Sequence, residues 1–161
     1  MILGMNIEFF TRLHVVISLI AIAAGLGVVL GFLTRRQFPI LNALFLLLTA
    51  LTSITGFMFP FKGVTPGIVV GVLSMVALLI AVVARYVGHM AGPWRGAYII
   101  SSCLALYFNV FVLFAQLFAK VPELKAIAPT QQSPGFALTQ MAILVLFVAL
   151  TFRSYKRFRI E

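Results

Sequence analysis

Five long apolar runs divide this chain, and polar residues gather between the runs rather than within them. The runs cover residues 13–33, 40–59, 67–87, 97–119 and 136–152. A helix rises 1.5 Å per residue, so about 20 apolar residues cross a hydrocarbon layer of ~30 Å. The pattern therefore predicts an all-α integral membrane bundle of five transmembrane helices.

The connections between the runs are short and rich in helix-breaking residues. They cover residues 34–39, 60–66, 88–96 and 120–135 and hold all seven prolines. None is long enough for a second domain, so we expect one transmembrane domain over residues 1–161. Five spans do not divide into two equal inverted halves, which disfavours a repeat-based transporter fold unless the protein dimerises.

The first run needs to be distinguished from a cleaved signal peptide, because 21–23 reads Ala-Ile-Ala after an apolar stretch. Signal peptides begin with a positive segment, whereas Glu8 balances Arg12 here, and the apolar run continues to Leu33. We interpret it as a permanent span. Asn6 is placed to cap its helix, with Glu8 favourable in the first turn.

Composition agrees with a membrane protein: 63% of residues are apolar and 9% are charged. Soluble domains average roughly 45–50% and 25%, so a soluble fold is excluded. The net charge of +9 would suggest nucleic acid for a soluble protein, but the basic residues lie at the ends of apolar runs, and we expect no nucleic-acid partner. Cys103 stands alone, which excludes an internal disulfide and a cysteine-based metal cluster.

The two sides of the predicted bundle differ in positive charge. One side carries Arg35, Arg36, Arg85, Arg95, Arg153, Lys156, Arg157 and Arg159, and the other carries Arg12, Lys62, Lys120 and Lys125. Loops rich in Lys and Arg stay in the cytoplasm. We therefore expect the amino terminus outside and the carboxyl terminus in the cytoplasm, in a bacterial inner membrane.

Small residues in the spans indicate close helix packing, and aromatic residues near the span ends indicate anchoring at the membrane interface. Gly27 and Gly31, like Gly67 and Gly71, are spaced four apart, which lets helix backbones approach within the bundle or across a homodimer seam. Trp94 with Tyr86 and Tyr98, and the basic-aromatic tail at 152–159, are typical of anchors at the inner interface. Such a tail also attracts anionic lipid.

Polar side chains concentrate in the predicted outer half of the spans. Residues that share helix faces there are His14, Ser18, Ser53, Asn109, Gln116 and Gln140. Because polar groups in hydrocarbon face the bundle interior or a wet cavity, we predict that these six line an outward-facing ligand pocket. The alternative is that Ser and Thr bond their own helices while Asn and Gln join neighbouring helices.

The residues of this sequence leave only a few candidate cofactors. His14 and His89 lie at opposite membrane faces, which excludes haem between two histidines of one chain. His14 with Met58 or Met141 leaves haem or copper as candidates. An apolar slot with His14 and Gln116 or Gln140 suits a quinone.

Enzymatic motifs are absent, since the sequence has no paired carboxylates, HExxH or glycine-rich phosphate loop. Spans without Asp or Glu also argue against a carboxylate proton relay. The sequence thus favours a non-enzymatic module that holds a small or lipophilic ligand and serves transport or as a carrier. The alternatives are an accessory or assembly subunit of a larger membrane complex, and a redox protein with haem, copper or quinone.

Overall fold

The computed structural model describes residues 2, 4–60, 63 and 66–159. Within this part the chain is helical and has no named strand. The elements are α1 (Ile7–Thr34), α2 (Pro39–Phe57), α3 (Pro66–Val82) continued by the π-helical turn η1 (Val83–Val87), α4 (Pro93–Lys120), α5 (Pro122–Ile127) and α6 (Pro134–Arg157). Five helices, counting α3 with η1 as one, are long and apolar enough to cross a membrane. The predicted five-span all-α fold is confirmed.

Local sequence explains where the helices begin. Every helix from α2 to α6 starts on a proline, a residue that suits the first helical turn because it has no N–H to leave unsatisfied. Helix α1 starts instead after Asn6, whose side-chain oxygen accepts a hydrogen bond of 2.7 Å from the Phe9 N–H. The predicted cap is confirmed, and α1 begins six residues before its apolar run.

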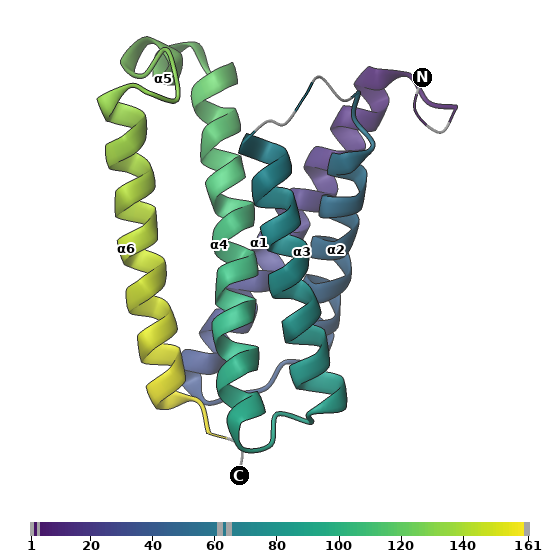
Figure 1. The fold of residues 1–161 in the computed structure, drawn as a ribbon, viewed down its shortest axis with the longest axis vertical. Helices are drawn as coiled ribbons and strands as arrows, with labels where there is room; N and C mark the ends of the chain where they lie inside the picture. The colour runs from purple at the N-terminus through teal and green to yellow at the C-terminus, as the bar shows by residue number, and fades with distance from the viewer. Residues whose placement is uncertain (1, 3, 61–62, 64–65, 160–161) are drawn as a thin grey trace.

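The long helices stand side by side (Figure 1), and α4 is central because it contacts α1, α3 and α6. Helix α1 pairs closely with α2, whereas α6 stands at the side of the bundle against α4 and α1. Helix α5 and the amino terminus lie at one end, called here the α5 end. The carboxyl terminus lies at the other, called here the C-terminal end (Figure 1).

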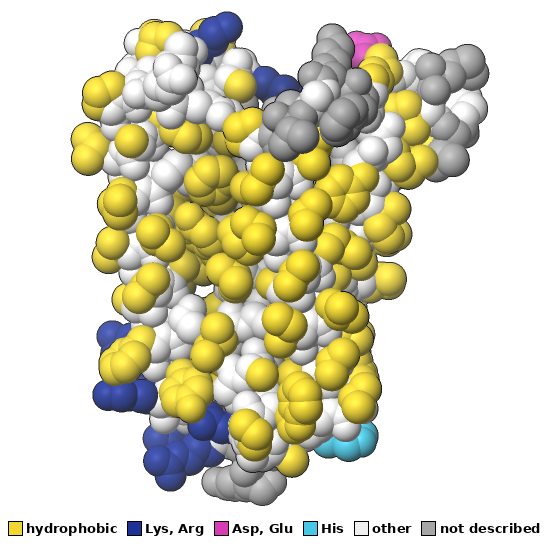
Figure 2. Space-filling model, in the orientation of Figure 1, with side chains coloured by type: hydrophobic (Ala, Val, Ile, Leu, Met, Phe, Trp, Pro, Cys, Tyr) yellow, Lys and Arg dark blue, Asp and Glu magenta, His cyan; other side chains and the backbone are white. Residues whose placement is uncertain are grey.

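The core is formed where α1 passes α2 and α4. Gly25 is buried there, and an added Cβ would lie 2.7 Å from Leu106 Cδ1 and 2.8 Å from the Phe45 ring. By contrast, apolar side chains cover much of the outer surface (Figure 2). Leu79 of α3 and Val145 of α6 are among the exposed ones. An apolar exterior on helices of this length fits burial in lipid.

One interpretation from the sequence changes with the structure, because Tyr98 is fully buried rather than exposed at the membrane interface. Helix α6 continues into the basic tail and ends at Arg157. Gly27, Gly31 and Gly71 meet Leu41, Phe38 and Phe57 of this same chain. Packing within the chain therefore accounts for these three glycines. Lys62, counted above with the outer side, lies outside the described residues.

Candidate functional site

His14 joins α1 to α2 near the α5 end. Its Nδ1 lies 2.7 Å from Thr55 Oγ1, and the Thr55 hydroxyl itself donates to the Leu51 carbonyl at 2.7 Å. Since that hydroxyl has one hydrogen, His14 Nδ1 is the donor to Thr55, which leaves Nε2 as an acceptor when the ring is neutral. Ser18, predicted to share the pocket, donates instead to the His14 carbonyl at 2.7 Å.

Asn109 joins α4 to α2 in the middle of the bundle. Its Nδ2 donates to Thr49 Oγ1 at 3.2 Å, and both residues are buried. Ser53, also buried, follows Thr49 by one helical turn on α2. The Asn109 amide thus makes the interhelical contact expected under the alternative interpretation.

Gln140 joins α6 to α4. Its Nε2 donates to the Phe111 carbonyl at 3.1 Å. Its Oε1 is buried and accepts no hydrogen bond from any described residue. The side chain is only 8% exposed, so this acceptor lies away from solvent without a partner, which is costly.

The remaining predicted residues lie apart from these contacts. Gln116 is exposed near the end of α4. Met141 is exposed on α6, and Met58 is half-buried at the C-cap of α2. Three of the six predicted ligand residues, His14, Asn109 and Gln140, therefore each join a different helix pair. Ser18 bonds its own helix, Ser53 is buried on α2, and Gln116 is at the surface.

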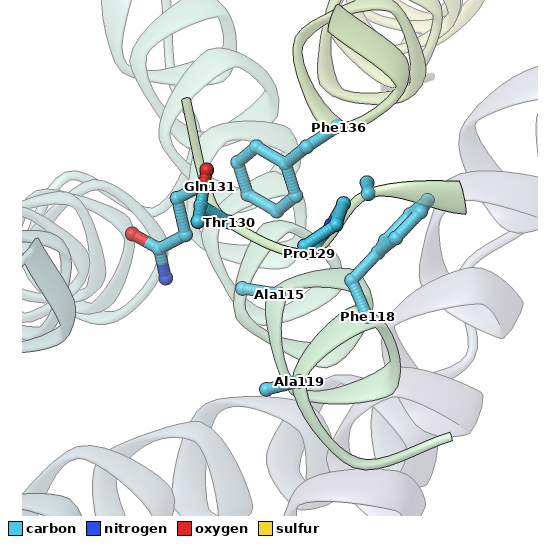
Figure 3. Close-up of a pocket in the computed structure, with 8 residues that line it drawn as sticks. Ala115, Phe118, Ala119, Pro129, Thr130, Gln131 and Phe136 are labelled. Carbon is cyan, nitrogen blue, oxygen red and sulfur yellow. The ribbon is translucent and has the colours of Figure 1, made fainter. Parts of the chain in front are cut away.

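A small cavity of about 50 Å³, called here the α4–α6 cavity, lies at the α5 end between α4, residues 128–131 after α5, and Phe136 at the start of α6. Figure 3 shows Phe118 of α4 and Phe136 of α6 on either side of Pro129, with the Gln131 amide pointing away from the Phe136 ring. The ring centres of Phe118 and Phe136 are 5.7 Å apart. A second hollow, of about 170 Å³, lies against Asn6, Glu8, Phe9 and Arg12.

Gln140 lies close beneath the α4–α6 cavity. On α6 it follows the cavity residue Phe136 by four positions, and on α4 its partner Phe111 precedes the cavity residue Ala115 by four. Four residues are about one helical turn, or ~6 Å. The unpaired amide oxygen is thus about one turn deeper in the membrane than the cavity.

Sequence reasoning missed a polar cluster at the C-terminal end. The Tyr98 hydroxyl donates to Asn42 Oδ1, Asn42 Nδ2 donates to the Phe38 carbonyl at 2.9 Å, and the Arg85 guanidinium lies 5.4 Å from the Tyr98 ring centre. The helical period of the sequence contained a signal for this cluster. Tyr98 precedes Ser102 by one turn on the face of α4 that also carries Asn109, and Arg85 follows the buried Ala81 by one turn.

Metal-binding groups are dispersed in the described part of the chain. No group of three or more His, Cys, Asp or Glu side chains there is close enough to hold an ion. His89 follows η1 at the C-terminal end, whereas His14 is near the start of α1. Cys103 is buried as a free thiol.

Comparison with known proteins gives no match to a family model, to a curated protein or to a solved structure.

Proposed function

We propose that this chain is a membrane module that holds a small lipophilic ligand between α4 and α6, in the half of the bundle nearest α5. The observation that carries the proposal is the Gln140 amide, buried with its Nε2 bonded to Phe111 and its Oε1 without a described partner. An unpaired acceptor in a membrane interior destabilises the protein, and a ligand that donates a hydrogen bond to it removes that cost.

Aromatic rings around this amide suit a flat apolar ligand. Phe111 and Phe136 have ring centres 6.4 Å apart across the α4–α6 contact, and Tyr107 lies 5.7 Å from Phe147 farther along it. Offset or edge-on ring contacts add about 0.5–1.5 kcal/mol beyond area burial. A ring compound inserted beside these side chains gains the same contacts.

The size of the cavity sets a condition on binding. A volume of about 50 Å³ has room for a few water molecules, whereas pockets that hold drug-sized ligands measure about 300–1,000 Å³. Larger ligands must therefore move α6 away from α4. Helix α6 is the element best placed to move, because it stands at the side of the bundle. Only 22% of its most apolar stretch of 18 residues is buried.

Hydrogen-bond polarity narrows the ligand class. Gln140 Nε2 already donates one hydrogen bond to the Phe111 carbonyl, whereas Oε1 has no described partner, so the unmet requirement at Gln140 is for a hydrogen-bond donor. A phenol, an alcohol or a quinol supplies the required donor, whereas an oxidised quinone has only carbonyl acceptors. We therefore propose a lipophilic hydroxyl compound, entering sideways from the outer leaflet, with a carrier role following from its release on the same side.

Native mass spectrometry of the gently extracted protein tests this function. We expect the wild type to carry a small molecule in addition to the 17.7 kDa chain, and Gln140→Leu to lose it. Gln116→Leu removes an exposed amide from α4 and is the matched control, which should keep the ligand. Because Gln140→Leu also removes the unpaired oxygen, its thermal stability without ligand should be close to wild type.

Two outcomes contradict the proposal. One is a ligand retained equally by Gln140→Leu and the wild type. The other is a spectrum with no small molecule but with a multi-subunit mass, which would favour the accessory-subunit role.

A further inference from the structure

Arg85 is a positive charge without a described carboxylate near it. Its guanidinium lies 5.4 Å and 5.8 Å from the ring centres of Tyr98 and Tyr86, and its Nη1 is 3.7 Å from Met90 Sδ. The described carboxylates, Glu8 and Glu123, belong to the first turns of α1 and α5 at the other end. The third acid, Glu161, is not among the described residues. Only neutral groups are seen to hold this cation.

The local fold fixes where Arg85 lies. It falls one turn after Ala81 on the face that packs against α4, and it is half-buried there. It also belongs to the π-helical turn η1, closed by a 2.8 Å bond from the Gly88 N–H to the Val83 carbonyl. Tyr98 beneath the guanidinium is itself held by Asn42.

Other cations at this end are likewise held by neutral atoms. Arg95 donates to the main-chain carbonyls of Tyr155 and Phe158, and Arg157 donates to that of Leu33 at 3.3 Å. Figure 2 shows the Lys and Arg side chains gathered at the foot of the bundle near α6. The described surface at the C-terminal end is therefore strongly positive.

The exposed flank of α3 beside Arg85 is apolar and long enough for acyl chains. Tyr86, whose ring centre is 5.8 Å from the Arg85 guanidinium, is 52% exposed. Leu79 and Val72, seven and fourteen positions earlier on the same helix face, are 64% and 51% exposed. Trp94, also exposed, packs over Gly88 at the level of the same loop. An anion at Arg85 would thus lie at the edge of a surface that needs lipid to cover it.

We propose that Arg85 binds the phosphate of an anionic phospholipid whose acyl chains lie along the exposed face of α3. A guanidinium binds phosphate through two parallel hydrogen bonds, which an ammonium group does not reproduce. Charge complementarity selects an anionic headgroup, and the adjoining apolar face selects a lipid over a soluble anion. With the predicted orientation, this lipid belongs to the cytoplasmic leaflet.

Lipid counting by native mass spectrometry tests the site. Protein is reconstituted into vesicles of phosphatidylglycerol and phosphatidylcholine in equal amounts, then released and weighed with the lipids it retains. We expect the wild type to retain phosphatidylglycerol preferentially. Arg85→Gln should lower that retention by about tenfold, the effect of one charge-assisted contact worth ~1.4 kcal/mol, and Arg85→Lys should restore part of it. Arg153→Gln, which removes an exposed charge from α6 at the same end, is the matched control and should retain the lipid.

Equal retention of the two lipids by the wild type overturns the proposal, as does undiminished phosphatidylglycerol on Arg85→Gln. Displacement of the lipid by excess inorganic phosphate would overturn it too, because the site would then belong to a soluble anion. If Arg85→Gln does not fold, the wild-type thermal midpoint decides. It must be higher in phosphatidylglycerol vesicles than in phosphatidylcholine vesicles, and an equal midpoint counts against the site.

Discussion

At the residue scale, the Tyr98–Asn42 pair predicts a recoverable loss of stability. Asn42→Leu removes the acceptor of the buried Tyr98 hydroxyl, and a buried group left unpaired costs about 1–3 kcal/mol. Adding Tyr98→Phe removes the orphaned hydroxyl, so the double variant should be more stable than Asn42→Leu alone. Unfolding in detergent, followed by circular dichroism, measures both.

Thr34→Val is the control for this pair, because it removes an exposed hydroxyl that bonds its own helix at Leu30. It should leave stability nearly unchanged. Strictly additive losses in the double variant would show that the two side chains are not coupled.

The sequence predicts which residues of the candidate site face inward, but not which residues they contact. Depth and helical period place His14, Asn109 and Gln140 on inward faces, and the structure finds them in interhelical hydrogen bonds. Their partners were not predictable, because a partner depends on the rotation and height of two helices at once. Thr55 and Thr49 became partners through the close pairing of α1 and α2 and the central place of α4.

At the element scale, helix existence follows from apolar length, and helix ends follow from local chemistry. The apolar run at 136–152 predicts the last span, but α6 extends over Pro134–Arg157, because a proline starts it and basic residues suit the negative end of a helix. The run at 40–59 overestimates α2, which ends at Phe57. Residues 58 and 59 are apolar, but apolar character alone does not make them helical.

Gly25 lies where α1, α2 and α4 meet, so substituting it tests how tightly these helices pack. Its added Cβ would lie within 2.8 Å of buried Leu106 and Phe45 side chains, so Gly25→Ala should destabilise the bundle by about 1–3 kcal/mol through overpacking. Gly56→Ala is the matched control, since its Cβ would meet His14 Cε1 at an ordinary 3.6 Å. That variant should be neutral or slightly stabilising, because alanine favours helix. Thermal midpoints in detergent compare them, and equal losses would contradict the packing at Gly25.

At the scale of the whole molecule, five spans place the two termini at opposite ends of the bundle (Figure 1), while the charge bias predicts which end faces the cytoplasm. Cysteine labelling of intact bacterial cells tests that orientation. In a Cys103→Ala background, Gln131→Cys reports the α5 end and Ala91→Cys the C-terminal end, both at exposed positions.

A membrane-impermeant maleimide should label Gln131→Cys in intact cells and Ala91→Cys only after the cells are opened. Both proposed sites depend on this geometry, because the ligand would enter from the outer leaflet at Gln140 and the anionic lipid would come from the inner leaflet at Arg85. Labelling of Ala91→Cys in intact cells would show that the bundle has the orientation opposite to the predicted one. It would also move both proposed sites to the opposite leaflets, and the basic end would then face away from the cytoplasm, against the charge bias of membrane proteins.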